Sequence, residues 1–328
     1  MGASPETETR PRVVFTSPLP GHPETLLEGI ARTTVHPFGG SRTEEELAEL
    51  LREATGTVTL LSDPVTDRVL DACPGLRVIA NYAVGYNNID VASARARGIS
   101  VTHTPDVLTE ATADLTWSLL LAAARRITEG HAMVLRGEFE GWAPNLLLGM
   151  DLHGKTLGIV GMGRIGRAVA RRAPGFGVRV VYAQQNPIPG SEEEALRARR
   201  LPLRELIETS DIVSLHCPLT EETRHLIDAE ALAAMKPGAL LINTARGAVV
   251  DEAALVATLR KGRISAGLDV YEREPEITEG LADLPNAVLL PHIGSAGAET
   301  RESMARMAAG DVRLVLEGQS PRHPVPET

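Results

Sequence analysis

The feature that most constrains this chain is a glycine-rich turn in "TLGIVGMGRIGRAVARR", with glycines at Gly161, Gly163 and Gly166. An apolar run precedes the turn and an amphipathic pattern follows it, which predicts a strand–turn–helix unit. In such a unit the first glycine permits the tight turn, the second lets the backbone approach a pyrophosphate, and the third lets the helix pack closely on the strand. Amides at a helix start attract phosphate and Arg164 adds positive charge, so the turn predicts a dinucleotide-binding unit.

Short β-branched runs alternate with helical patterns along most of the chain. Before the glycine turn we expect four strands, in "RVVFTS", "TVTLLS", "LRVIAN" and "ISVTHT". From the turn onward we expect six, in "TLGIVG", "VRVVYA", "DIVSLHC", "ALLINTA", "SAGLDV" and "AVLLPH". This alternation predicts parallel sheets covered by helices, and the wholly apolar strands fit sheets buried on both sides.

The position of the turn, near residue 161, indicates two domains. A complete set of strands precedes it, so the simplest account inserts a nucleotide-binding domain, residues 106–295, into an earlier domain. The earlier domain then comprises residues 1–105 and 296–328, with a final helix at about residues 298–317 returning to it. We therefore expect an α/β protein with two doubly wound parallel-sheet domains.

The composition of the chain limits its possible binding partners and its cellular compartment. The formal net charge of −10 argues against nucleic acid, since a duplex-binding surface needs a basic face. The longest apolar stretch, "LTWSLLLAAA", is too short to span a bilayer, and the start "MGASPETETRPR" lacks the apolar run of a signal peptide. Cys73 and Cys217 are the only cysteines, which fits a reducing compartment. We expect a soluble cytoplasmic protein with a short disordered leader and no nucleic-acid or membrane partner.

Polar side chains gather where three of the later strands end. Arg246 follows "ALLINTA", and His292 ends "AVLLPH". Asp269 lies near the end of "SAGLDV", with Glu274 a few residues on. The carboxyl ends of parallel strands meet at one crevice, so these groups are expected to converge. An arginine can bind a carboxylate, a histidine can donate a proton and a nearby carboxylate favours imidazolium, which together suit the reduction of a 2-oxo acid.

Taken singly, each of these residues has a plainer interpretation. His292 could cap the following helix, Arg246 could bridge to a surface acid, and Glu274 could be a loop charge. Their joint placement behind a nucleotide motif favours a site. His, Asp and Glu elsewhere show no spacing typical of a metal site, so we expect no metal.

The tip of the strand after the glycine turn carries no acid. A dinucleotide-binding fold usually places Asp or Glu there to hold the adenosine ribose. Here the tip reads Ala183, Gln184, Gln185 and Asn186. The amide side chains can donate hydrogen bonds but add no charge.

Longer motifs of the chain resemble those of the D-isomer-specific 2-hydroxyacid dehydrogenases, and within them the glyoxylate/hydroxypyruvate reductases. They are "LRVIANYAVGYNNID", "TPDVLTEATADLTWSLLLAAARR", "LGIVGMGRIGRAVARR", "LINTARGAVVDEAAL", "AGLDVYEREP" and "LLPHIGSA", in order over roughly residues 10–320. The resemblance implies a Rossmann nucleotide-binding domain inserted into a flavodoxin-like substrate domain. It also implies hydride transfer between NAD(P)H and a small 2-oxo acid.

The resemblance implies roles for individual residues. Arg246 would bind the substrate carboxylate and carbonyl, His292 would be the acid/base, and Glu274 would pair with His292. Val84 and Gly85 would offer backbone amides to the substrate carboxylate. Cofactor contacts are implied for Thr112, Gly161, Gly163, Arg164, Ile165, Gly166, Ala183, Gln184, Gln185, Asn186, His216, Pro218, Thr244, Ala245, Asp269 and Gly294.

The same resemblance bears on the choice of cofactor. NAD-specific relatives carry Asp at the position of Ala183, and an Asp there would also repel a 2′-phosphate. NADP-preferring relatives usually add an Arg within the next few residues, which this chain lacks. The expectation is NADP(H) first, with NAD(H) as the second cofactor. His216 is expected to be a pocket wall, and Cys217 a small packed residue beside the adenine.

A homodimer is also implied by the resemblance. The interface would comprise the helix Leu108–Arg126 and the arm "GEFEGWAPNLLLG". Trp142 on this arm would project toward the active site of the other subunit and so contact substrate. An ordinary interface anchor is the equal alternative for Trp142.

Two other functions stay open at this stage. A dehydrogenase of a different small anion, such as formate or phosphonate, shares the scaffold; in formate enzymes Gln replaces the Glu partner of His, so Glu274 argues against formate. A nucleotide-sensing corepressor or binding protein on the same fold can retain all the catalytic residues. Turnover of a 2-oxo acid would separate these readings.

Overall fold

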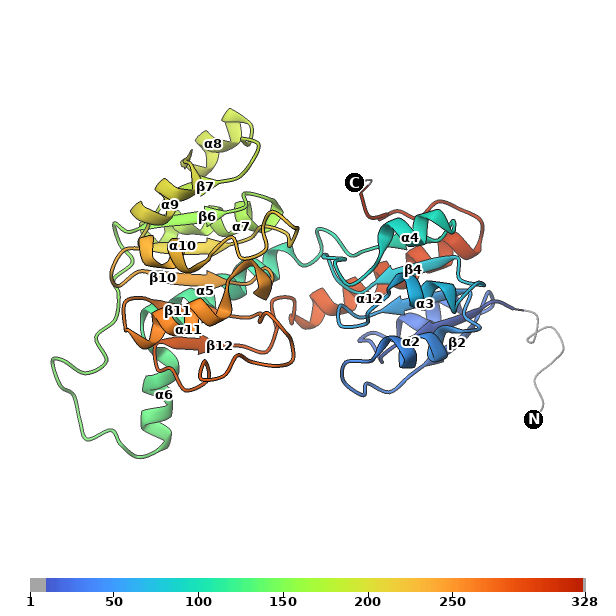
Figure 1. Cartoon of the computed structure of the whole chain (residues 1–328), viewed down its shortest axis with the longest axis horizontal. Coiled ribbons are helices and arrows are strands. Elements are labelled where there is room, and N and C mark those ends of the chain that lie inside the picture. Colours follow the sequence, from blue (N-terminus) through green and yellow to red (C-terminus); the bar gives the residue numbers. More distant parts are fainter. Residues whose placement is uncertain (1–9, 327–328) are drawn as a thin grey trace. The chain divides into compact units, whose positions relative to one another are not determined.

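A computed structural model describes residues 10–326 of the chain, and the expected leader falls largely outside them. The chain forms two compact units. The first takes the chain up to Leu108 and again from Ser295, and the second is Thr109–Gly294. Each unit is a parallel sheet with helices on its faces, so the predicted α/β class with two parallel-sheet domains is confirmed (Figure 1).

The first unit contains a five-stranded sheet with the strand order β2-β1-β3-β4-β5. Every neighbouring pair is parallel. This is the flavodoxin-like order, in which the direction of winding reverses between β1 and β3. Its elements are β1 (Arg12–Phe15), η1 (Pro23–Leu27), β2 (Arg32–Val35), α2 (Glu44–Leu51), β3 (Gly56–Thr59), α3 (Asp67–Asp71), β4 (Val78–Asn81), α4 (Val91–Ala96), β5 (Ser100–Thr102) and α12 (Ala298–Leu316).

Helices cover both faces of this sheet because successive apolar side chains of a strand point to opposite faces. In β1, Val13 and Phe15 join the cluster that contains Val312 of α12. Val14 joins the opposite cluster, which contains Leu47 of α2. The last helix of the chain therefore closes one face of the first sheet.

The second unit contains a seven-stranded sheet with the order β12-β11-β10-β9-β6-β7-β8. All neighbouring pairs are parallel, and the direction of winding reverses between β6 and β9, where such folds bind ligands. Its elements are α5 (Thr109–Ala124), α6 (Ile127–Leu135), β6 (Thr156–Val160), α7 (Arg164–Arg172), η2 (Ala173–Phe176), β7 (Arg179–Ala183), α8 (Gly190–Leu196), β8 (Ala198–Arg200), α9 (Leu203–Thr209), β9 (Ile212–Leu215), α10 (Ala229–Ala234), β10 (Leu240–Asn243), η3 (Gly247–Val249), α11 (Glu252–Arg260), β11 (Ser265–Leu268) and β12 (Ala287–Leu289).

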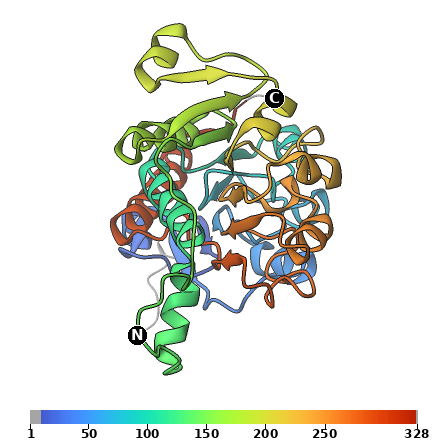
Figure 2. The same ribbon diagram turned by 90° about the vertical axis from the view of Figure 1, so that its left-hand side faces the viewer.

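Both faces of the second sheet are also covered. In β6, Leu157 and Ile159 join a cluster with Trp117 of α5, whereas Val160 joins the opposite cluster with Leu255 of α11. Figure 2 shows α5 continuing into α6, which extends away from the sheet together with the segment that follows it. Among the described helices, none is long and apolar enough to cross a membrane.

Two strands lack the sequence pattern by which the others were predicted. The expected number of strands is therefore wrong in both units. β2 reads "RTTV", and β8 reads "ARR". Each lies at an edge of its sheet and has no buried side chain. A strand without a buried face lacks the apolar alternation by which strands are recognised.

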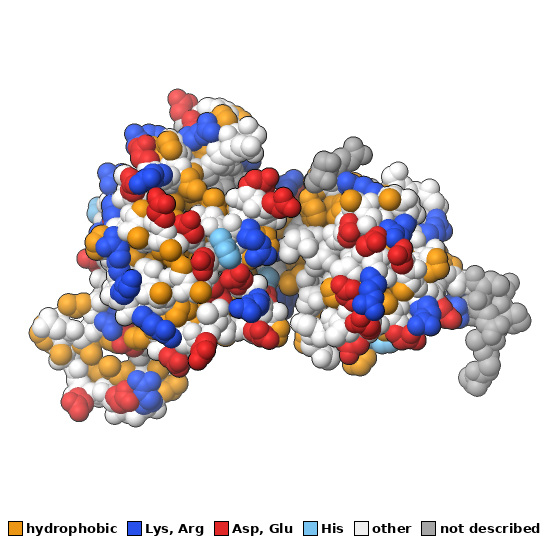
Figure 3. Space-filling view, viewed as in Figure 1, with side chains coloured by type: hydrophobic (Ala, Val, Ile, Leu, Met, Phe, Trp, Pro, Cys, Tyr) orange, Lys and Arg blue, Asp and Glu red, His pale blue; other side chains and the backbone are white. Residues whose placement is uncertain are grey.

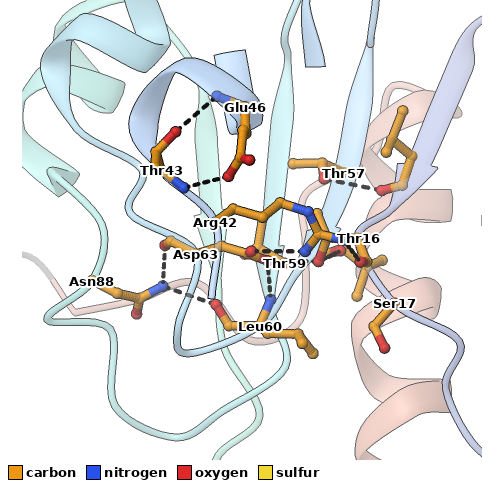
Figure 4. A network of polar contacts seen from close by, with 12 residues as sticks. Thr16, Ser17, Arg42, Thr43, Glu46, Thr57, Thr59, Leu60, Asp63 and Asn88 are labelled. Atoms are coloured by element: carbon orange, nitrogen blue, oxygen red, sulfur yellow. Dashed lines mark hydrogen bonds and ion pairs between the residues drawn. The ribbon is translucent and has the colours of Figure 1, made fainter. Parts of the chain in front are cut away.

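A buried polar network ties together the loops at the carboxyl end of the first sheet (Figure 4). Asp63 is fully buried, and its carboxylate accepts hydrogen bonds from Thr16 Oγ1 at 2.6 Å and the Leu60 amide at 2.8 Å. Arg42 pairs with the carboxylate, with Nη1 and Oδ1 3.2 Å apart, and donates from Nη2 to the Thr16 carbonyl oxygen at 2.6 Å. The network thus balances the buried charge of Asp63.

Asp63→Ala should lower the free energy of unfolding by about 3–5 kcal/mol, because it leaves Arg42 without its carboxylate and Leu60 without its acceptor. Urea unfolding followed by circular dichroism would measure the loss. Glu49→Ala is the matched control, since it breaks an ion pair with Arg52 in which both side chains are exposed, and should cost no more than about 1 kcal/mol. Equal losses in the two variants would contradict this account.

Candidate functional site

In the turn between β6 and α7, each of the three glycines is needed for a different physical reason. Gly161 has a φ of 94°, and a Cβ there would lie 2.7 Å from the Cys217 amide nitrogen. A Cβ on Gly166 would overlap the carbonyl oxygen of Gly161. At Gly163 a Cβ would meet no atom within 4 Å, so this glycine faces open space. The turn therefore packs tightly on the protein side and leaves room where a pyrophosphate would approach.

A cavity of about 1160 Å³ begins at this turn and runs past the tip of β7. Its walls come from the glycine turn, the β7 tip, the loop after β8 and the loop after β9. The lining residues are Val160, Gly161, Gly163, Ala183, Gln184, Gln185, Asn186, Arg200, Leu201, Pro202, Leu203, His216, Cys217, Pro218, Thr220, Glu222, Thr223 and Leu226. Eight of the predicted cofactor residues are thus brought together, and Arg200 is an unpredicted member.

Hydrogen bonds hold the β7 tip against the glycine turn. The Gly161 amide donates to the Ala183 carbonyl oxygen at 2.9 Å, and the Met162 amide donates to Gln184 Oε1 at 2.9 Å. From β8, Arg200 Nη2 donates to the carbonyl oxygens of Gln184 at 3.1 Å and Gln185 at 2.7 Å. The tip is therefore fixed from both sides.

His216 and Cys217 form an uncharged wall of the cavity. Burial lowers the pKa of His216 to about 3, so its imidazole is neutral at ordinary pH and forms a hydrogen bond with Ser214 Oγ at 2.8 Å. Burial raises the pKa of the Cys217 thiol to about 11, so the reactive thiolate is absent. This environment suits packing rather than acid–base or nucleophilic chemistry.

At the ends of β11 and β12 a carboxylate and an imidazole form a pair. His292 Nδ1 lies 2.7 Å from Glu274 Oε2, and the Tyr271 amide donates to Glu274 Oε1 at 3.0 Å. Burial works to raise the pKa of Glu274, but the hydrogen bond and charge of His292, helped by the Tyr271 amide and Arg246, bring it below its usual value. Glu274 is thus held as a carboxylate that engages His292 Nδ1, and Nε2 is the ring nitrogen outside this pair.

Arg246 follows β10 and is partly buried. Its own carbonyl oxygen accepts a hydrogen bond from Asn243 Nδ2 at 2.9 Å, and Nη1 donates to the Ala245 carbonyl oxygen at 2.7 Å. Burial lowers the pKa of the guanidinium, and the charge of Glu274 opposes that effect. An arginine stays protonated in a protein, so Arg246 brings a fixed cation to the carboxyl edge of the sheet.

Asp269 offers an unused acceptor in the same region. Its side chain is buried, with Oδ1 accepting from the Ile293 amide at 2.7 Å, while Oδ2 forms no hydrogen bond within residues 10–326. Burial raises the pKa of Asp269, against the lowering effect of the Ile293 amide and His292. A Cβ built on Gly294 would lie 3.2 Å from Oδ2 and 3.8 Å from Thr112 Oγ1. The Asp269 carboxylate and the Thr112 hydroxyl thus both lie close to Gly294.

The remaining predicted residues lie in several places. Thr244 Oγ1 lies 2.9 Å from Thr116 Oγ1, on the helix that carries Thr112. Ile165 packs on the core under the turn rather than lining the cavity, and Arg164 begins α7. Trp142 lies beyond α6 and is 85% exposed.

Val84 and Gly85 belong to the first unit, in the loop after β4. The Val84 carbonyl oxygen lies 2.8 Å from His103 Nδ1. The Gly85 carbonyl oxygen accepts a hydrogen bond from Asn81 Nδ2 at 2.8 Å. Within residues 10–326 their amides donate no hydrogen bond. These amides are therefore available to a ligand.

A family model described as D-isomer specific 2-hydroxyacid dehydrogenase, NAD binding domain, matches residues 117–294. The chain belongs to this family. The predicted family is thus confirmed. As a D-isomer specific 2-hydroxyacid dehydrogenase, the protein uses a nicotinamide dinucleotide.

Curated and structural relatives agree with this assignment. A glyoxylate reductase of Thermococcus gammatolerans is 47% identical over 317 residues, which cover 95% of each chain. A crystal structure of a Thermus thermophilus protein has a TM-score of 0.88 and 50% identity, covering 96% of this chain and all of that one. An NADPH-dependent glyoxylate/hydroxypyruvate reductase of Sinorhizobium meliloti, solved with NADP and malonate, has a TM-score of 0.85 and 35% identity, covering 97% of each chain.

Gly163→Ala should leave stability unchanged and weaken dinucleotide binding at least about tenfold, because the new methyl group enters the space left for the pyrophosphate. Titration of NADPH fluorescence would measure the affinity, and thermal unfolding would measure the stability. Gly175→Ala is the control, since a Cβ there also meets no atom within 4 Å but lies away from the turn. Unchanged affinity in Gly163→Ala would show that the pyrophosphate does not approach this glycine.

Proposed function

We propose that this dehydrogenase is a glyoxylate/hydroxypyruvate reductase that acts on small 2-oxo acids. The observation that carries the proposal is the His292–Glu274 pair, 2.7 Å apart, beside the guanidinium of Arg246. These groups can protonate a carbonyl oxygen and bind a carboxylate. Support for the substrate class comes from curated relatives that are glyoxylate reductases and are 45–48% identical to this chain.

Each residue then has a defined role in the proposal. The bound dinucleotide supplies the hydride. Arg246 binds the substrate carboxylate and polarises the carbonyl, and the backbone amides of Val84 and Gly85 also bind the carboxylate. His292 Nε2 donates a proton to the carbonyl oxygen, and Glu274 stabilises the protonated imidazole. In oxidation His292 takes the proton back.

The two units divide these tasks. We assign residues 106–295 to the NAD(P)-binding domain, which matches the family model over most of its length. Residues 1–105 and 296–328 form the proposed substrate domain. Contacts with the dinucleotide are assigned to the predicted residues that line the cavity, together with Thr112, Thr244, Ala245, Asp269 and Gly294.

For the cofactor we propose NADP(H) first, with NAD(H) also used. No acid lies at Ala183, so no carboxylate would repel a 2′-phosphate there. Support also comes from the Sinorhizobium meliloti reductase, which is NADPH-dependent. A cytoplasmic location is supported by the two cysteines, which are both buried and unpaired.

A corepressor or binding protein on the same fold is the alternative of a different class. Retained catalytic groups are compatible with it, so turnover of a 2-oxo acid is the observation that separates the two functions. Glu274 also argues against formate as the substrate.

We further propose a homodimer formed through the helix Leu108–Arg126 and the arm "GEFEGWAPNLLLG" at residues 137–149, together with α6, which lies between them. Large apolar side chains are exposed there, including Val134 at 61%, Leu135 at 74% and Leu148 at 65%, in addition to Trp142. Figure 3 shows apolar side chains gathered over this projecting segment. An apolar surface of this kind marks an interaction site, and a second copy with the same surface can cover it. Trp142 would then contact the substrate site of the partner copy.

His292→Gln should reduce turnover of glyoxylate with NADPH by at least about a hundredfold while sparing cofactor affinity. Arg246→Ala should impair the use of glyoxylate more than the binding of NADPH, since it removes the cation that holds the carboxylate. Steady-state kinetics and fluorescence titration would separate these effects. Unchanged kinetics in either variant would remove that residue from the site.

Leu135→Asp combined with Leu148→Asp should convert the dimer to a monomer, because each places a charge on the proposed interface. Sedimentation velocity would measure the mass in solution. Ile277→Asp is the control, as Ile277 is 43% exposed in the same unit but lies outside the arm. A wild-type monomer, or a double variant that stays dimeric, would contradict the proposed interface.

A further inference from the structure

We propose that Arg200 binds the 2′-phosphate of NADP(H) and is the residue that determines the choice between the two dinucleotides. The inference rests on the proposed function and deepens it, since it concerns how the same cofactor site selects its ligand. It departs from the sequence-based expectation that the selecting Arg would follow Ala183 directly and is therefore missing.

The fold brings Arg200 to the β7 tip from the next strand. Arg200 ends β8, which pairs in parallel with β7 so that Arg200 stands opposite Tyr182. Its Nη2 donates to the carbonyl oxygens of Gln184 and Gln185, at 3.1 and 2.7 Å. These contacts place the guanidinium beside Ala183, where this fold normally holds the adenosine ribose.

Arg200 has no ion-pair partner in the part of the chain that the structure describes. Among the described residues that line the cavity, it is the only Lys or Arg. The neighbouring Arg199 differs, since its guanidinium lies 3.9 Å from the Glu205 carboxylate. Arg167, which follows the glycine turn, pairs with Glu192 at 2.7 Å. Arg200 is therefore the cation that an anionic group on the ribose would meet.

The hydrogen-bonding groups at the β7 tip also favour Arg200 as the residue that binds the 2′-phosphate. A guanidinium has five N–H donors, and the two carbonyl contacts use only Nη2. Gln184 has little left to offer, because its Oε1 accepts from the Met162 amide and its Nε2 donates to the Asn186 carbonyl oxygen. A doubly charged phosphate is bound most strongly by a guanidinium, so Arg200 dominates over the neutral amides.

The test uses the full-length protein and two adenosine nucleotides that lack the nicotinamide half. Isothermal titration calorimetry compares adenosine 2′,5′-bisphosphate with adenosine 5′-monophosphate. Arg200→Gln should weaken binding of the bisphosphate about ten- to a hundredfold and change binding of the monophosphate less than about twofold. Glutamine can still donate to the tip carbonyls, so this variant removes the charge while keeping the local contact. Arg199→Gln, on the same strand, should change neither affinity.

Unchanged binding of the bisphosphate by Arg200→Gln would overturn the inference, as would an equal loss for both nucleotides, which indicates a merely structural role. The outcome is separable from that of the proposed function. A wild-type protein that reduces glyoxylate with NADH but shows no preference for the bisphosphate would overturn this inference alone. A protein whose preference for the bisphosphate depends on Arg200, but which reduces no 2-oxo acid, would support this inference and overturn the proposed function.

Discussion

The close approach of the glycine turn to the backbone after β9 is the constraint on which the cofactor site depends. At Gly161 the backbone of the β6–α7 turn lies against His216 and Cys217, so closely that a side chain cannot be placed there. This contact occurs at the point where the winding of the seven-stranded sheet reverses. It leaves Gly163 facing open space, and the cavity for a dinucleotide continues from there along the β7 tip.

The protein controls charge along this site by controlling burial. His216 is neutral and Cys217 stays a thiol, so the wall beside the cavity is chemically inert. At the proposed catalytic groups, the structure instead pairs Glu274 with His292, and the charge of Arg246 acts on the Glu274 carboxylate. The proposed catalytic groups thus follow β10, β11 and β12, whereas the described cavity is lined by the glycine turn, the β7 tip and the loops after β8 and β9.

Much of this arrangement could be predicted from the sequence, because it rests on patterns that are local. The glycines follow one apolar strand, and Arg246, Glu274 and His292 each follow a recognisable buried strand, so their convergence follows from the geometry of parallel sheets. The edge strands β2 and β8 could not be predicted, since neither buries a side chain. The position of Arg200 could not be predicted for the same reason, because Arg200 reaches the β7 tip through the pairing of β8 with β7. The hydrogen bond from the Met162 amide to Gln184 could not be predicted either, since it depends on how closely two loops 22 residues apart approach each other.

The central claim is that the His292–Glu274 pair, acting with Arg246, makes this chain a reductase of small 2-oxo acids. The most direct measurement is the conversion of hydroxypyruvate by the wild-type protein with NADPH and with NADH, followed by chiral analysis of the glycerate formed. The account predicts oxidation of the reduced dinucleotide with equal amounts of D-glycerate produced. A folded protein that binds the dinucleotide but forms no glycerate from hydroxypyruvate and no glycolate from glyoxylate, or that forms L-glycerate, would contradict it.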